Sequence, residues 1–278
     1  MGSSARRSEP GPTRLTASNA DPHLLYHESV QSPDVDAAFL SRLYCRLTGH
    51  PLRHLREDFC GTAFLSAAFT KLHSENRATG IDLHGPTLRW AKRHNLPQLT
   101  PSQRERLTLV KANVLDVRRP RAQLVVAMNF SWFVFKTRDL VRRYVGNAMA
   151  SLDRGGLLVM DLFGGSDAVA EQKERRRQHG FSYVWDQKRF DPVTNEILCA
   201  IHFEFRDGTR IRDAFTYDWR LWSIPELSEV MKEVGFADVH VLWEATDLRT
   251  NRGNGVYRRV TNGESDPSWL AYVVGKRP

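Results

Sequence analysis

The first clear pattern of hydrophobic and polar positions lies in residues 33–49, where apolar residues recur every three or four positions. Ser32 and Pro33 stand at its start, and they are favoured at the N-cap and the first helical position. Gly49 closes the stretch, as glycine often does after a helix. The pattern predicts an amphipathic helix. Its expected apolar face carries Val35, Phe39, Leu43 and Leu47.

From residue 55 to residue 165, short apolar runs alternate with amphipathic stretches, which predicts alternating strands and helices. Leu124–Met128 and Leu157–Leu162 are continuously apolar, as expected for strands buried on both faces of a parallel sheet. The expected strands are a run ending at Phe59, "RATGIDL", "LTLVKANV", "AQLVVAMNF" and "GGLLVMDLF". The expected helices cover about 63–73 and 86–94, and a third begins after the N-cap Thr137.

After residue 165 this alternation breaks. The stretch "SDAVAEQKERRRQHG" is predicted as a helix, and the Asp207-Gly208 pair beyond it is a strong hairpin signal. We interpret the strand-like runs around that pair as an inserted antiparallel lid. The runs are 181–190, 195–206 and 209–220.

The last part of the chain again alternates between helix and strand patterns. A capped helix is expected from Ser223 to Gly235, followed by the strands "ADVHVLWEA" and "SWLAYVVGK". The predicted fold class is therefore α/β, with a Rossmann-like, seven-stranded, mostly parallel sheet, helices on both faces and an inserted antiparallel lid. The expected divisions are a disordered tail (1–20), an N-terminal helical segment over the ligand site (21–54), a core (55–165), a helix plus lid (166–220) and a C-terminal part of the core sheet (221–278).

Composition and charge narrow the class of protein. No apolar run approaches the ~18 residues that a membrane span needs, and the N-terminus shows no secretory apolar region. Three widely spaced cysteines predict neither a disulfide framework nor a metal site, and they fit a reducing cytoplasm. The formal net charge is +8, but its densest run, Arg175–Arg177, is better explained as a solvated face than as a nucleic-acid surface.

Candidate ligand-binding residues follow three of the expected strands. In an open α/β sheet, ligands bind at the carboxyl ends of the strands, near the reversal of strand order. Asp82 stands 21 residues after Gly61, the spacing at which an acid accepts the hydroxyl groups of a ribose. Asn113, after the third strand, can pair with an adenine edge.

The turn after the first strand is poor in glycine. Phe59 and Ala63 occupy positions where a diphosphate-binding turn usually has glycine, and Glu57 and Asp58 add negative charge. This disfavours a nicotinamide dinucleotide. A ligand with adenosine, no phosphate and a cationic group fits better, and S-adenosylmethionine (SAM) is such a ligand.

The motifs "EDFCGTAFLSAAF", "GIDLHGPTLRWAKRHN", "KANVLDV", "LVVAMNFSWFVFKTRDL" and "SLDRGGLLVMDLFGG" together resemble those of class I SAM-dependent methyltransferases. The resemblance covers about residues 55–278 and is strongest to bacterial small-molecule enzymes with a strand-rich lid. It departs from the family at Phe59 and Ala63, where glycine is usual. The cofactor-binding residues that it implies are Tyr26, Glu57, Gly61, Thr62, Asp82, Leu83, Asn113, Val114, Met128 and Asn129.

The acceptor side is less defined. Phe130, Ser131, Trp185 and Trp222 are the expected substrate-binding residues. The candidates for a proton-accepting catalytic residue are Asp161, His202 and Tyr217. Asp161 can instead cap a helix and His202 can face solvent, while each of the aromatic residues can simply pack in the core.

Three functions compete at this point. The leading hypothesis is methyl transfer from SAM to a small-molecule acceptor, with no nucleic-acid or membrane partner and with a homodimer left open. The second is a SAM-using cyclase or lyase that acts on the methionine chain. The third is a nucleic-acid methyltransferase, which the charge suggests. It is disfavoured because no Asn-Pro-Pro-Tyr-like tetrapeptide follows the fourth strand.

Overall fold

The computed structural model describes residues 14–247, 249 and 252–278. The chain divides into two compact units. Of the described residues, the first unit comprises 14–31 together with 171–188 and 199–216, and the second comprises those within 32–170, 189–198 and 217–278.

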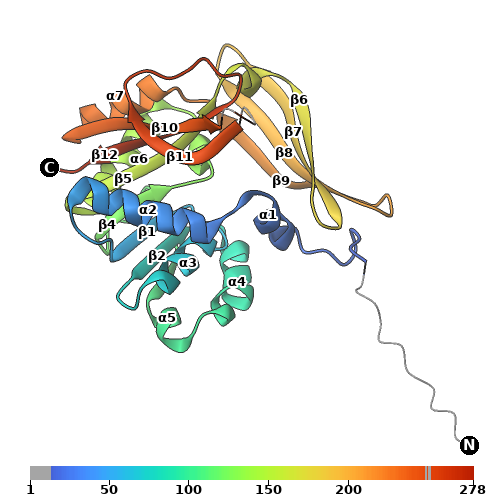
Figure 1. Ribbon diagram of the computed structural model, residues 1–278, viewed down its shortest axis with the longest axis horizontal. Coiled ribbons are helices and arrows are strands. Elements are labelled where there is room, and N and C mark those ends of the chain that lie inside the picture. Colours follow the sequence, from blue (N-terminus) through green and yellow to red (C-terminus); the bar gives the residue numbers. More distant parts are fainter. Residues whose placement is uncertain (1–13, 248, 250–251) are drawn as a thin grey trace, which may run out of the picture. The chain divides into compact units, whose positions relative to one another are not determined.

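A large mixed sheet forms the centre of the second unit (Figure 1). Over the described residues it has eight strands in the order β11-β10-β12-β5-β4-β1-β2-β3. Neighbours from β5 to β3 are parallel, whereas β12 is antiparallel to β5, and β10 is antiparallel to both β12 and β11. The strands are β1 (His54–Asp58), β2 (Arg77–Asp82), β3 (Leu107–Lys111), β4 (Ala122–Ala127), β5 (Leu152–Gly164), β10 (Asp238–Asp247), β11 (Arg252–Val260) and β12 (Trp269–Lys276).

The predicted fold class is confirmed, and β11 is one strand more than expected. Its sequence, "RGNGVYRRV", has two glycines and three arginines and therefore no alternating apolar pattern. This segment is nonetheless a strand, because it pairs with β10 at the edge of the sheet.

Helices cover both faces of this sheet. Helices α2 and α3 pack together, as do α6 and α7, and Figure 1 shows the two pairs on opposite sides of the strands. The helices of the second unit are α2 (Pro33–Thr48), α3 (Phe64–Leu72), α4 (Gly85–His94), α5 (Pro101–Glu105), α6 (Arg138–Ala150) and α7 (Ile224–Val234). Short 3-10 turns are η1 (Leu96–Gln98), η2 (Ser131–Val134) and η3 (Ser166–Val169).

The predicted first helix is present as α2, and most of its expected face points inward, because Leu43 is buried and Phe39 and Leu47 pack against the core. Ala37, Leu40 and Tyr44 are also buried, whereas Val35 is 64% exposed. Positions i, i+3 and i+7 share one side of a helix, and Val35 lies outside the stripe that begins at Ala37. Gly49 ends the helix at φ 76°, as predicted.

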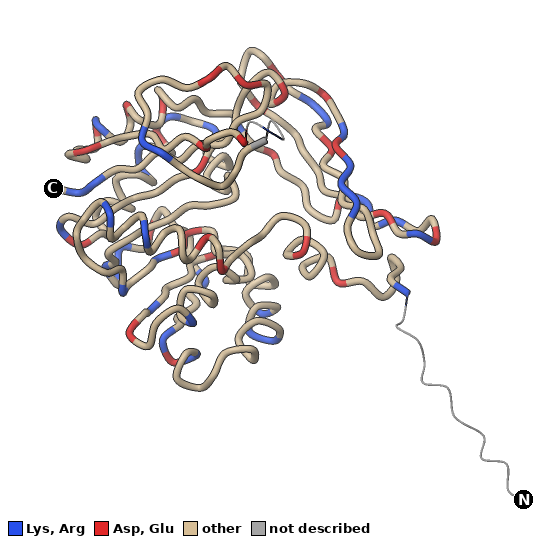
Figure 2. Tube along the Cα trace, viewed as in Figure 1, with Lys and Arg blue, Asp and Glu red and all other residues tan. Residues whose placement is uncertain are grey.

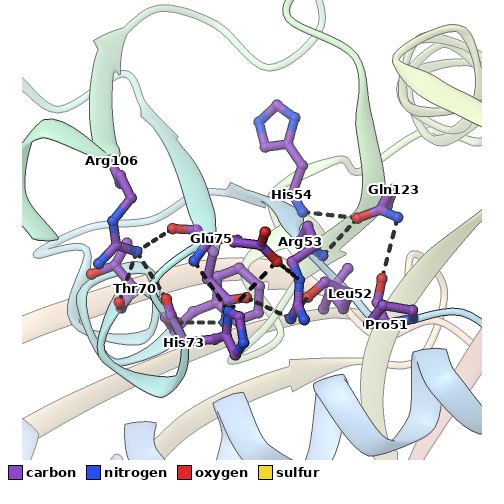
Figure 3. Close-up of polar contacts among 11 residues, drawn as sticks. Pro51, Leu52, Arg53, His54, Thr70, His73, Glu75, Arg106 and Gln123 are labelled. Carbon is purple, nitrogen blue, oxygen red and sulfur yellow. Dashed lines mark hydrogen bonds and ion pairs between the residues drawn. The ribbon is translucent and has the colours of Figure 1, made fainter.

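Polar side chains tie together the amino ends of the strands, at the edge of the sheet opposite the candidate site (Figure 3). The Gln123 side-chain oxygen accepts hydrogen bonds from the backbone N–H groups of Arg53 and His54, at 2.6 and 2.9 Å. The Arg106 guanidinium donates to three backbone carbonyls at the end of α3 and beyond. They belong to Thr70, His73 and Asn76.

The second sheet has the order β6-β7-β8-β9. Strands β7, β8 and β9 confirm the three predicted runs, and each contributes residues to both units. Gly208 takes φ 87° in the predicted hairpin turn. The strands are β6 (Gln172–Arg177), β7 (Phe181–Asp191), β8 (Glu196–Phe205) and β9 (Arg210–Arg220).

The helix predicted for residues 166–180 is wrong. Residues 166–169 form η3, and β6 pairs antiparallel with β7. Every residue of β6 is exposed, so this stretch has no apolar stripe with which a helix could pack. Figure 2 shows the densest basic run of the chain on this strand. Charged side chains of this kind protect a sheet edge from unwanted pairing.

The N-terminal helix of the first unit is α1 (Pro22–Val30). Most of the predicted disordered tail, residues 1–13, lies outside the described residues. Residues 14–20 were also assigned to that tail, but they form a turn in which the Ala17 N–H donates to the Thr209 hydroxyl at 3.0 Å. Among the described residues, no helix is both long and apolar enough to cross a membrane.

Candidate functional site

The candidate site lies at the carboxyl end of β1, where the order of the strands reverses. The chain proceeds from β1 to β2 and β3 on one side and then returns to place β4 on the other side of β1. The turn that follows β1 has three residues with positive φ: Phe59 at 57°, Gly61 at 52° and Ala63 at 55°. Two of these are not glycine, yet the turn adopts the left-handed backbone that glycine favours. The turn therefore takes a left-handed backbone at Phe59 and Ala63 without glycine at either position.

Asp82, at the end of β2, connects to this turn directly. Its carboxylate accepts the Gly61 N–H at 2.8 Å through one oxygen and the His84 N–H at 2.7 Å through the other. A carboxylate has about four acceptor positions, so these two bonds leave capacity for hydroxyl donors. The spacing noted in the sequence thus brings the acid and the glycine turn into contact.

Gly80 explains how the turn packs against β2. A methyl group placed there would lie 2.9 Å from the Cys60 sulfur and 3.1 Å from Leu109. Burial raises the pKa of the Cys60 thiol well above its ordinary value. Cys60 is therefore a packed neutral thiol.

One face of β1 carries a buried ion pair. The Arg56 guanidinium donates to both oxygens of Asp58, at 2.7 and 3.2 Å, and the Tyr144 hydroxyl donates to the same carboxylate at 3.0 Å. Arg56 and Asp58 are 0% and 1% exposed. Burial raises the pKa of Asp58, and the charge of Arg56 opposes this rise. The Phe59 ring packs 5.7 Å from that of Tyr144, so the pair lies directly beneath the turn.

Glu57 points to the other face of β1, because side chains alternate along a strand. One of its oxygens accepts both the backbone N–H and the hydroxyl of Ser66, at 2.9 and 2.5 Å. Ser66 lies in the first turn of α3, whose N-cap residue, Ala63, has no side chain that could accept these bonds. Glu57 therefore supplies the missing cap from a neighbouring strand. Burial raises its pKa to about 7.

The residues after β3 form the expected polar corner. The Asn113 side-chain oxygen accepts the Leu115 N–H at 3.0 Å, which fixes the orientation of the amide. Val114 is buried, and its carbonyl accepts from Asn147 at 2.6 Å. Leu83 is 64% exposed beside Asp82. Thr62 is buried, and its carbonyl accepts from Asn95.

The segment after β4 is held from β5. The Asp161 carboxylate accepts the backbone N–H groups of Asn129 and Phe130, at 2.6 and 2.9 Å. Met128 is buried, and its carbonyl accepts from the Ser131 hydroxyl at 2.8 Å. Asp161 is 4% exposed, and burial raises its pKa to about 7.

Aromatic side chains gather beside this segment. Phe130 packs edge-on against Phe163 at 4.7 Å, and Trp219 lies 5.8 Å from Phe133 and 4.4 Å from Tyr217. Of these rings, Phe130, Phe163 and Tyr217 are partly exposed.

Trp222 has a structural explanation in the core of the second unit. It is 3% exposed and donates its indole N–H to the Phe135 carbonyl at 3.0 Å, and the Arg220 guanidinium lies 3.8 Å over its ring. A wall residue of a substrate pocket needs an exposed face, which Trp222 does not offer here.

Three of the predicted site residues, Tyr26, Trp185 and His202, belong to the first unit. The Tyr26 ring lies 5.1 Å from that of Phe215, and Trp185 is half-buried next to Asp186. The Nδ1 atom of His202 accepts the Asp213 N–H at 2.8 Å, and Nε2 lies 3.0 Å from Asp186. Both ring nitrogens are thus engaged, which disfavours His202 as a proton acceptor.

The other predicted residues belong to the second unit, where β1, β2, β3, β4 and β5 bring most of them to the carboxyl edge of the sheet. Sequence reasoning missed Asp36, in the first turn of α2. Its burial raises its pKa to about 6, and its charge contributes to the raised pKa values of Glu57 and Asp161. An acid in the first turn of a helix normally complements the helix dipole, so the sequence around Asp36 did not indicate a role at the site. No group of three or more metal-ligating side chains occurs in the described part of the chain.

Comparisons with known proteins agree with this architecture. No protein-family model matches the sequence, and no curated protein is similar to it. Among solved structures, a SAM-dependent methyltransferase from Clostridium acetobutylicum covers 92% of this chain and 98% of its own, with a TM-score of 0.65 and 15% identity. DesVI from Streptomyces venezuelae covers 92% and 96%, with a TM-score of 0.66 and 19% identity. CalS10, an amino pentose methyltransferase from Micromonospora echinaspora, covers 92% and 96%, with a TM-score of 0.65 and 15% identity. The chain has the fold of these three proteins, two of which are described as methyltransferases that use or bind SAM.

Proposed function

We propose that the protein is a SAM-dependent methyltransferase that acts on a small-molecule acceptor. The observation that carries this proposal is the left-handed turn of Phe59, Gly61 and Ala63, joined by hydrogen bond to Asp82 at the reversal of strand order. This constellation offers hydroxyl acceptors and close backbone approach without the additional glycines of a diphosphate site. The fold shared with SAM-dependent methyltransferases supports the same proposal.

The residues present fit the chemistry of SAM. Asp82 would accept the ribose hydroxyls, and Asn113 would meet the adenine. The buried acids Glu57 and Asp161, with Asp36 beside them, would make the edge electronegative once they ionise above about pH 7, which suits a ligand with a sulfonium and an ammonium group. SAM supplies an activated methyl group, so the protein has mainly to align the acceptor and exclude water.

The acceptor would bind beside the segment after β4. Phe130, Phe163 and Tyr217 present partly exposed rings there, and small-molecule sites are mostly apolar with few polar groups. Solved structures that share the fold include an amino pentose methyltransferase and a sugar N-methyltransferase. Amino sugars are therefore the first acceptors to test.

We also propose that the second sheet serves as a lid and that the segment 21–54 covers the cofactor, with Tyr26 as a contact. In support, residues 171–188 and 199–216 form a compact unit with the N-terminal residues, distinct from the unit that holds the large sheet. Units with separate cores can move relative to each other.

Calorimetry tests the cofactor. We expect binding of SAM and of adenosylhomocysteine but not of NAD. Asp82→Ala should weaken SAM binding by about 1–3 kcal/mol, because hydrogen bonds to a charged group are lost. The matched control is Asp153→Ala, which changes an exposed acid at the start of β5, at the other end of the sheet. Binding of NAD without binding of SAM would exclude the proposal.

Product analysis tests the reaction. Mass spectrometry of mixtures containing SAM and amino sugars should detect adenosylhomocysteine together with a methylated acceptor. Methylthioadenosine in place of adenosylhomocysteine would indicate reaction at the methionine chain. Methyl incorporation into bulk tRNA or rRNA would contradict a small-molecule acceptor.

A further inference from the structure

Asp161 stands where β4 leaves the sheet. The pairing of β4 with β5 ends at Ala127 and Met160, so Asp161 is the next residue along β5. Its carboxylate accepts the N–H groups of Asn129 and Phe130, one on each oxygen, at 2.6 and 2.9 Å. Beyond the last backbone pair of β4 and β5, the Asp161 side chain therefore provides the hydrogen bonds between the two segments.

The two residues that it holds are conformationally costly. Asn129 and Phe130 have φ values of 59° and 57°, in the left-handed region that non-glycine residues seldom adopt. A residue in this region is strained and persists only when its surroundings impose it. A third contact fixes the same segment, because the Trp132 indole N–H donates to the Asp161 carbonyl at 2.6 Å.

We propose that Asp161 is a positioning residue, which holds the segment Asn129–Trp132 in its left-handed turn and so sets the place of Phe130 beside the reacting groups. The role of Asp161 in aligning the acceptor rests on the proposed function, whereas its hydrogen bonds to the segment Asn129–Trp132 do not. Asp161 was a candidate general base in the sequence analysis. A general base must be reached by the acceptor, but Asp161 is 4% exposed, and its two oxygens are directed at the backbone N–H groups of Asn129 and Phe130.

The groups around Asp161 determine the pH at which its carboxyl group ionises. Burial is the largest influence on it, the two N–H donors favour the anion, and Asp36 on α2 disfavours it. Tyr272 on β12 and Tyr257 on β11 are the neighbouring phenols, and burial raises the pKa of both. The carboxylate therefore titrates in the neutral range, where its effect on the segment can be observed.

Nuclear magnetic resonance of the free protein tests the hydrogen bonds from Asn129 and Phe130 to the Asp161 carboxylate without any ligand. An N–H proton that donates to a carboxylate changes its chemical shift when the carboxylate takes up a proton. We expect the amide protons of Asn129 and Phe130 to titrate together near pH 7, and Asp161→Asn to abolish that titration. Amide resonances that do not move at any pH between about 4 and about 9 in the wild-type protein would overturn the proposal, and this result does not depend on whether the variant folds.

Turnover separates positioning from proton transfer. With an acceptor that yields adenosylhomocysteine, Asp161→Asn should lower kcat by about 100-fold, since misplacement of about 1 Å has effects of that size. The loss should persist at higher pH and with added imidazole. Recovery under either condition would identify Asp161 as a general base and overturn the proposal. Failure of SAM to bind the wild-type protein would contradict the proposed function alone.

Discussion

At the scale of single residues, Glu57 and Asp161 are buried carboxylates whose pKa is raised to about 7 by burial. Each therefore keeps its proton at pH values where an exposed acid would be ionised, and becomes an anion only above about pH 7. A cationic ligand stabilises the anion and lowers the pKa. We expect SAM affinity to rise between about pH 6 and about pH 8, by up to about tenfold for each of the two acids, with release of protons on binding.

Calorimetry in two buffers of different ionisation enthalpy measures both quantities. The matched control ligand is methylthioadenosine, which shares the adenosine part but has no cationic group, and its affinity should change much less over the same range. SAM affinity that is constant or falls with pH would show that these acids do not face the cation.

At the scale of elements, the contact between β2 and the turn after β1 depends on Gly80. A methyl group there would lie 2.9 Å from the Cys60 sulfur, closer than real contacts allow. Gly80→Ala should lower the free energy of unfolding by about 1–3 kcal/mol through overpacking. Gly146→Ala in α6 is the matched control, because its new methyl would meet nothing closer than Val234 at 3.9 Å.

The control should act in the opposite direction. Alanine is preferred over glycine inside a helix, so Gly146→Ala should raise the free energy of unfolding by about 0.5–1 kcal/mol. Denaturant titration of both variants measures the difference. Equal effects of the two substitutions would contradict the close packing of Gly80.

Arg106 joins elements at the other edge of the sheet. It follows α5 and donates to the carbonyls of Thr70, His73 and Asn76. Arg106→Ala should cost about 1.5–3 kcal/mol of unfolding free energy, because carbonyls lose a charged donor. Arg104→Ala, within α5, removes an exposed side chain with one long contact to Leu99 and should cost no more than about 0.5 kcal/mol. Denaturant titration compares the two.

At the scale of the whole molecule, the division into two units carries its own prediction. If residues 171–188 and 199–216 act as a lid, their amides should exchange more slowly with solvent when adenosylhomocysteine is bound, because lids belong to the less stable parts of a fold and are ordered by ligands. Hydrogen-exchange mass spectrometry measures this. Slower exchange confined to residues 32–170 would contradict the lid. Peptides from β11, at the far edge of the large sheet, serve as an internal control.

The sequence by itself determined the parts of this protein that depend on local pattern. The order of strands from β1 to β5, the hairpin at Gly208 and the helix that begins after Ser223 all follow from apolar periodicity, turn residues and caps. The contact between Gly61 and Asp82 was also readable, because both residues follow parallel strands, whose carboxyl ends meet at one edge.

Only the tertiary structure decided the features that depend on a partner remote in sequence. Residues 172–177 are strand and not helix because β7 offers an edge to pair with. Glu57 caps a helix whose own N-cap residue, Ala63, cannot, and Asp161 holds two residues 31 and 32 positions away. Phe59 and Ala63 adopt a backbone that their side chains disfavour. Local propensities are worth about 1 kcal/mol or less for ordinary residues, whereas buried hydrogen bonds to charged groups and close packing are worth more, so the surroundings prevail wherever the two disagree.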